Sequence, residues 1–155
     1  MPGKIIKKLF SFKLIALVYA VLIFIISSLP QITLPSLGFT FEDKVYHFLE
    51  YAIFSFLLFL AFFNAQKNFF RRNVFLFSSL IGIIYAYSDE FHQRFVPGRT
   101  YDLYDFLADC LGIILIQAIL WGYRRWKIGN PALRSVPSGS KTKGGDRRTV
   151  APPGG

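Results

Sequence analysis

The sequence predicts an all-α fold, a four-transmembrane-helix bundle with both termini in the cytoplasm. Over half of the 155 residues are hydrophobic and 18% are aromatic, which is more apolar surface than a soluble domain of this size buries well. These residues fall into four runs that approach the ~20 residues needed to cross a bilayer. Charges are segregated: 15 of the 18 Lys and Arg residues lie in two tails and one loop, and eight of the nine acids lie between Glu42 and Asp109.

The first span is expected at residues 12–29, after a basic N-terminal segment. A basic start followed by an apolar run also describes a signal peptide. The run is long for a signal peptide, and no small-x-small cleavage site follows it before Pro30. We therefore interpret this segment as an uncleaved helix that ends at the proline.

The other spans are expected at residues 44–63, 74–92 and 103–123. A basic connection with Lys67, Arg71 and Arg72 separates the second span from the third. Val96-Pro97-Gly98 predicts a turn before the fourth span, because proline fixes φ and glycine tolerates positive φ. These spans define a transmembrane domain over residues 1–128.

Residues 129–155 form a tail rich in Gly, Pro, Ser and basic residues, with almost nothing to bury. This composition predicts disorder. Its charge can hold it near anionic lipid, although a solvated tail without a partner explains the composition as well.

The positive-inside rule places the basic tails and the basic middle loop in the cytoplasm. The basic charge is thus a topology signal, and no nucleic-acid partner is expected. Every acid except Asp146 then lies at or near the outer end of a helix. Cys110 is the single cysteine, so an intrachain disulfide and a multi-cysteine metal site are excluded.

Some of these acids have a structural explanation. The second and fourth spans begin at the outer face, where an acid caps free N–H groups and meets the positive end of the helix dipole. Asp43 and Asp102 are adequately explained as caps, and Asp105 partly so. For these three residues a capping role and a functional role remain open.

Other acids lack that explanation. Asp89 and Glu90 end the third span, where the dipole disfavours carboxylates, so they need partners such as Lys44, His47, Arg94 or Arg99. Glu50 and Asp109 lie about two turns inside their helices, or ~10 Å along the axis. A charged acid is unfavourable at that depth. Each must face the bundle interior, a hydrated vestibule or a partner.

Polar residues three or four apart share a helix face, and these spacings place one polar stripe at the outer end of each of the last three spans. We predict that the stripes form an outward-facing pocket roofed by Gly98 and Arg99. The alternative is a hydrogen-bond network that only fastens the helices together. The pocket and ligand-binding candidates are Asp43, Lys44, His47, Glu50, Tyr51, Asp89, Glu90, His92, Gln93, Arg99, Asp105 and Asp109.

Three motifs in this order resemble the VanZ-like family. They are Asp43-Lys44-x-x-His47-Phe48-x-Glu50-Tyr51, Ser88-Asp89-Glu90-x-His92-Gln93-x-Phe95-Val96-Pro97-Gly98-Arg99 and Asp105-x-x-x-Asp109-x-x-Gly112. VanZ-like proteins are small bacterial integral membrane proteins, and the founding member confers low-level teicoplanin resistance. The resemblance implies a multi-pass protein of the bacterial cytoplasmic membrane with a role in the cell envelope, and it supplies no reaction.

Three functions follow from these features. The first is binding of a lipid-linked or anionic cell-wall component, altering how glycopeptide antibiotics engage the surface. Arg99, Arg94 and Lys44 would meet its phosphate or carboxylate, while Asp89, Glu90 and His47 orient these cations. The partners are then membrane lipids and a lipid-linked component or glycopeptide.

The second function is a membrane enzyme that uses the acids and histidines for acid–base chemistry. No cofactor is expected and no metal-ligand spacing stands out, with Glu90, His92, Asp105 and Asp109 as the weaker metal candidates. The third is a small ion-coupled transporter, since buried acids often mark ion pathways. The inner halves of the spans carry no charge, which disfavours transport.

Overall fold

The computed structural model describes residues 11–30, 41–99 and 101–130. All regular secondary structure in these ranges is helical, which confirms the all-α prediction for this part of the chain. The expected disordered tail lies outside the described residues from position 131 onward. The helices are α2 (Phe12–Ser27), α3 (Glu42–Phe63), α4 (Asn68–Arg72), α5 (Val74–Gln93) and α6 (Leu103–Gly129).

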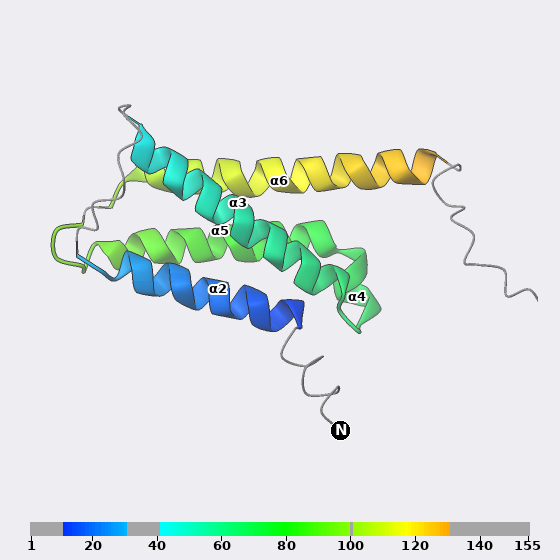
Figure 1. The fold of residues 1–155 in the computed structure, drawn as a ribbon, viewed down its shortest axis with the longest axis horizontal. Coiled ribbons are helices and arrows are strands. Elements are labelled where there is room, and N and C mark those ends of the chain that lie inside the picture. The colour runs from blue at the N-terminus through cyan, green and yellow to red at the C-terminus, as the bar shows by residue number, and fades with distance from the viewer. Residues whose placement is uncertain (1–10, 31–40, 100, 131–155) are drawn as a thin grey trace, which may run out of the picture.

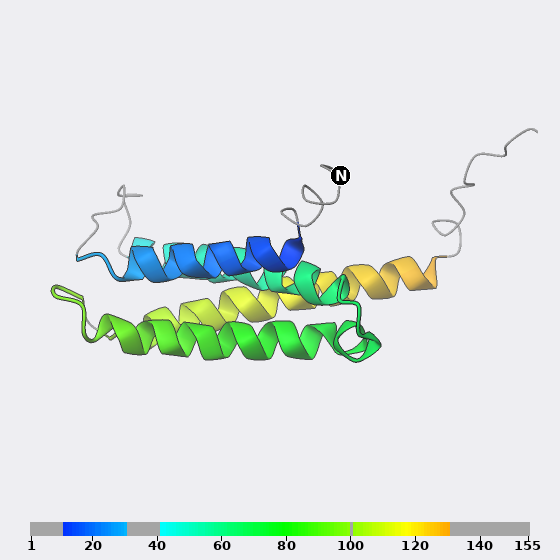
Figure 2. The same ribbon diagram turned by 90° about the horizontal axis from the view of Figure 1, so that it is seen from below.

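The four long helices lie side by side and alternate in direction, and the short α4 closes one end (Figures 1 and 2). Helix α3 crosses the others obliquely and contacts α2, α5 and α6, with its most extensive contact to α6. The starts of α3 and α6 therefore meet the ends of α2 and α5. We call this the acidic end, because it carries Asp43, Glu50, Asp89, Glu90, Asp102, Asp105 and Asp109.

The opposite end of the bundle is basic. Helix α4 and the last turns of α6 lie there (Figure 1), and they carry Arg71, Arg72, Arg124, Arg125 and Lys127. The segregation of charge along the sequence is thus a segregation in space, with the two signs at opposite ends of the helices.

Helices α3, α5 and α6 are long and apolar enough to cross a membrane. Large apolar side chains such as Leu76 and Leu111, 61% and 62% exposed, cover their outer surface as expected for contact with lipid. Helix α2 is apolar but has 16 described residues, or about 24 Å of helix against a ~30 Å hydrocarbon core. The fourth span and the orientation of the termini remain predictions.

Helices α2, α3 and α5 begin and end within two residues of the predicted spans. Helix α6 instead continues to Gly129, beyond the expected end at residue 123. Arg124, Arg125 and Lys127 are good helix formers and are favourable at the negative end of the dipole. They therefore extend the helix past the apolar segment. Helix α4 lies in the basic connection, where no helix was predicted.

A glycine sets the distance between α3 and α6. A Cβ atom at Gly112 would overlap the carbonyl oxygen of Phe48 and would lie 3.1 Å from the backbone nitrogen of Ala52. The two backbones can approach so closely only because glycine has no side chain. Asp109 lies one turn earlier on α6, so this contact also brings its carboxylate against α3.

Candidate functional site

The first turn of α6 is capped by Asp102, whose carboxylate accepts a hydrogen bond of 2.8 Å from the Tyr104 backbone N–H. This confirms the predicted cap. Asp43 is not the N-cap residue of α3, because the helix begins at Glu42 and its N-cap position is Phe41, but Asp43 lies in the first turn, where an acid is favourable at the positive end of the dipole. Asp43 lies inside the first turn and uses its carboxylate to bind Lys44.

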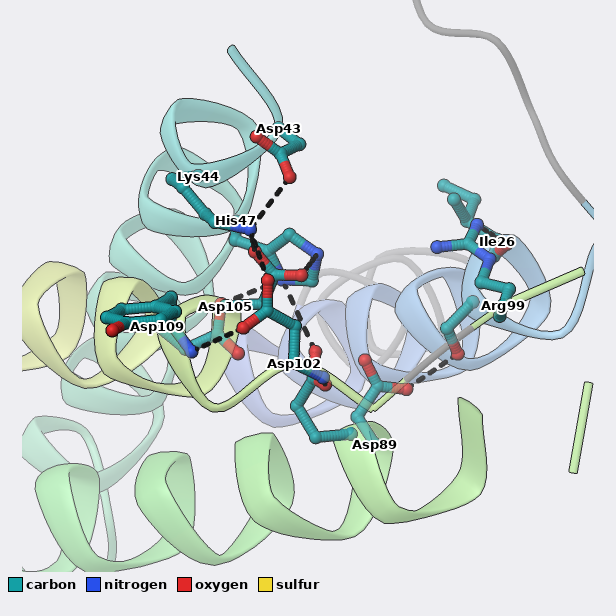
Figure 3. A network of polar contacts seen from close by, with 12 residues as sticks. Ile26, Asp43, Lys44, His47, Asp89, Arg99, Asp102, Asp105 and Asp109 are labelled. Atoms are coloured by element: carbon teal, nitrogen blue, oxygen red, sulfur yellow. Dashed lines mark hydrogen bonds and ion pairs between the residues drawn. The ribbon is translucent and has the colours of Figure 1, made fainter. Parts of the chain in front are cut away.

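Lys44 is the centre of the more exposed half of the acidic end. Its ammonium lies 2.8 Å from the Asp43 carboxylate and 2.6 Å from those of Asp102 and Asp105 (Figure 3). The hydrogen bond from Lys44 holds the pKa of the Asp102 carboxyl below its usual range. One cation thus joins the start of α3 to the start of α6.

His47 is the centre of the buried half. Its Nδ1 lies 3.1 Å from Asp109 Oδ1 and 3.8 Å from Glu90 Oε1, and its Nε2 lies 3.9 Å from Asp105 Oδ2. Glu90 and Asp109 are fully buried. The second Glu90 oxygen, Oε2, accepts a 3.4 Å hydrogen bond from the Asp102 backbone N–H. The imidazole therefore lies among carboxylates from α5 and α6.

Asp89 binds a neutral partner rather than the cations expected from the sequence. It accepts a 2.6 Å hydrogen bond from the Ser27 hydroxyl of α2, and the side chains of Tyr51 and Gln93 lie beside it. Glu50 is near enough to His47, Asp89 and Asp109 to interact with them electrostatically. Sequence reasoning did not identify Ser27 as a site residue; its one signal is a hydroxyl in the last turn of a largely apolar helix.

Arg99 follows the predicted turn, and Gly98 has the positive φ of 80° that this turn requires. The Arg99 guanidinium donates hydrogen bonds to the carbonyl oxygens of Leu29, at 3.3 Å, and Ile26, at 3.1 Å. A cation at the C-terminal end of α2 is favourable there. Figure 3 shows Arg99 beside Ile26, apart from the Lys44 network. Arg99 thus fastens its loop to the end of α2.

His92 lies at the same junction. Its Nε2 is 3.0 Å from the Ser28 hydroxyl, and its ring packs against that of Phe24 at a tilt of 33°, with centroids 4.7 Å apart. Arg94 lies over the ring of Phe91. These residues connect α5 to α2 or cover the end of α5. The structure therefore brings together Asp43, Lys44, His47, Glu50, Asp89, Glu90, Asp105 and Asp109, and places His92 and Arg99 against α2.

An apolar groove borders the Lys44 network. It has a volume of about 450 Å³ and runs along the first turns of α3 and α6. Lys44 lines both the groove and the ion-pair network. The groove is lined by Phe41, Lys44, Tyr104, Leu107, Ala108 and Leu111.

The described residues thus form a helical bundle of the kind found in membrane proteins, with a buried network of charged side chains at one end. The VanZ/LLP1 family model matches residues 4–124. The chain belongs to this family.

A relative in Schizosaccharomyces pombe, described as an uncharacterized protein, is 36% identical over 93 residues. The match covers 59% of this chain and 55% of the yeast protein, so the chain spans little more than half of that relative. No solved structure matches the chain.

Proposed function

We propose that the acidic end binds the phosphate-bearing end of a lipid-linked envelope component, with the lipid chain in the groove between α3 and α6. The observation that supports this function is the position of Lys44, which lies where the apolar groove meets the charged network. A lipid-linked anion has the same two parts, a long apolar chain and a polar end.

The groove suits the apolar part of such a ligand. Leu107 and Leu111 line it and are also exposed on the outer surface of α6, so a chain can enter sideways from the bilayer. Three carboxylates hold Lys44 in one place. A fixed cation recognises a phosphate with less loss of side-chain freedom than a mobile one.

We also propose that the protein spans the bacterial cytoplasmic membrane four times, with the acidic end outside the cell. The positive-inside rule supports this orientation, because the basic residues lie at the other end. Binding there would change how much of the component is exposed to glycopeptides such as teicoplanin. We therefore propose that the outward-facing ligand site lies around Lys44 and His47, and not around Arg99.

The test is binding of a polyprenyl phosphate to the purified full chain in lipid nanodiscs. We expect wild type to bind the phosphate more tightly than the corresponding polyprenol, because the alcohol offers no charge to Lys44. Leu107→Trp should fill the groove and weaken binding at least tenfold. The matched control is Leu115→Trp, which alters a similarly exposed residue of α6 outside the groove lining.

Equal affinities for the phosphate and the alcohol would contradict the role of the charged network. Equal affinities of Leu107→Trp and Leu115→Trp would contradict the role of the groove. Melting temperatures of both variants, measured in parallel, distinguish blocked binding from loss of the fold.

A second candidate function is a membrane enzyme acting on the same lipid-linked substrate. The observation that favours it is the position of His47, whose two ring nitrogens face carboxylates of Asp109 and Asp105. An imidazole oriented in this way can accept or donate a proton. Release of inorganic phosphate from polyprenyl diphosphate, abolished in His47→Gln, would favour the enzyme over the binding protein.

A further inference from the structure

Three helices each bring one metal-ligating side chain to the same point. These are His47 of α3, Glu90 of α5 and Asp109 of α6, and their ligand atoms all lie within 4.8 Å of one another. Nδ1 of His47 is 3.1 Å from Asp109 Oδ1 and 3.8 Å from Glu90 Oε1. Ligands bound tetrahedrally to Zn²⁺ at ~2.1 Å are separated by about 3.4 Å. The observed separations lie on both sides of this value.

Two oxygens of this group have no hydrogen-bond partner within the described residues. They are Glu90 Oε1 and Asp109 Oδ2, and both carboxylates are fully buried. A buried carboxylate oxygen without a partner is strongly unfavourable unless it is paired or coordinates a metal. Glu90 Oε1 points to the same imidazole nitrogen as Asp109. A cation bound at this nitrogen would supply the partner that the buried Glu90 Oε1 lacks.

The residues around His47, Glu90 and Asp109 are arranged like those that orient the ligands of a metal ion. The other imidazole nitrogen, Nε2, faces Asp105 Oδ2 at 3.9 Å, and metal-bound histidines commonly direct that nitrogen to a carboxylate. Lys44 holds Asp105. The second Glu90 oxygen accepts the Asp102 N–H, which leaves Oε1 directed at His47.

We propose that His47, Glu90 and Asp109 bind one divalent transition metal ion, Zn²⁺ or Mn²⁺. An imidazole ligand disfavours Ca²⁺ and Mg²⁺, which take oxygen ligands. One nitrogen and two carboxylates suit Zn²⁺ and Mn²⁺. Three protein ligands leave one coordination position open, as in catalytic zinc sites. The site includes His47 in place of His92, which lies against α2.

The role of the metal rests on the proposed lipid-phosphate function, whereas metal binding itself does not. The contacts at Lys44 and His47 involve five carboxylates, one lysine and one histidine. This excess of negative charge repels a phosphate. A divalent ion reduces the excess, and its open position can accept a phosphate oxygen. The metal would thus explain how an acidic end binds an anion.

The test is metal binding by the purified full chain after removal of metal with a chelator. Titration with Zn²⁺ and with Mn²⁺ should give one site per chain. Glu90→Gln and Asp109→Asn should each lower the affinity at least tenfold. The matched control is Glu42→Gln, which removes another carboxylate of the same end, in the first turn of α3 and outside the group of three ligand residues. Its affinity should stay within about threefold of wild type.

A second measurement does not depend on the variants being folded. X-ray absorption of wild type loaded with Zn²⁺ should show nitrogen and oxygen ligands near 2.0–2.2 Å without sulfur. Absence of stoichiometric binding by wild type, or equal loss of affinity in Glu42→Gln and Asp109→Asn, would overturn the site. If metal binding fails while polyprenyl phosphate still binds, the metal site alone is wrong. If the metal binds and the phosphate does not, the proposed function is wrong.

Discussion

Gly112→Ala is expected to separate α6 from α3 and to lower the stability of the protein by about 1–3 kcal/mol, the range for overpacking a tight contact. The added Cβ would overlap the carbonyl oxygen of Phe48, and a backbone atom cannot move aside as a flexible side chain can. Asp109 moves with α6, so the contact between its carboxylate and His47 should lengthen as well.

The measurement is the thermal midpoint of the purified chain in one detergent. The matched control is Gly122→Ala on the same helix, where an added Cβ has nothing within 4 Å. Replacing that glycine should be neutral or slightly stabilising, because alanine is the better helix former. Equal midpoints for the two variants would show that α3 and α6 are not in backbone contact at Gly112.

Lys44→Met is expected to destabilise the acidic end by about 1–3 kcal/mol at pH 7. Removing one partner of a buried ion pair costs ~3–5 kcal/mol, and partial exposure reduces this value. The side chain of Lys44 is 23% exposed and that of Asp102 is 33% exposed. Without the ammonium, the carboxylates at the starts of α3 and α6 repel one another. The matched control is Lys67→Met, which alters an exposed lysine at the other end.

The same variant has a predicted pH dependence. Lys44 lowers the pKa of Asp102 in the folded protein, so this carboxyl stabilises the fold above its unfolded pKa of ~4. That contribution is lost as the pH falls through the folded pKa. The melting temperature of wild type should therefore fall in this acidic range, and the difference between wild type and Lys44→Met should shrink. A difference that is constant from pH 7 to pH 3 would contradict the ion pair.

The helices were largely predictable because their signal is local. Runs of apolar residues bounded by Pro30 or by charged segments define α2, α3 and α5 to within two residues. The end of α6 was not predictable from hydropathy, because its last turns are basic and still helical. Helix α4 was missed because its five residues are too few for a recognisable period.

The side-chain contacts within the acidic end were only partly predictable from the sequence. Spacings of three and four correctly identify which residues share a helix face, but they do not fix the rotation of one helix against another. That rotation pairs His47 with Asp109, and it depends on the close contact at Gly112. The partners of Asp89 and Arg99 come from α2, whose last turn has no charged residue to suggest them.

The most direct test of the account is the side of the membrane on which the acidic end lies. In a Cys110→Ser background, Arg94→Cys and Arg72→Cys place single thiols at exposed arginine positions at opposite ends of the bundle. A membrane-impermeant maleimide added to intact cells should label the thiol at position 94 and label the one at position 72 only after lysis. Labelling of position 72 in intact cells, with position 94 protected until lysis, would place the network around Lys44 and His47 in the cytosol and contradict an outer-leaflet ligand.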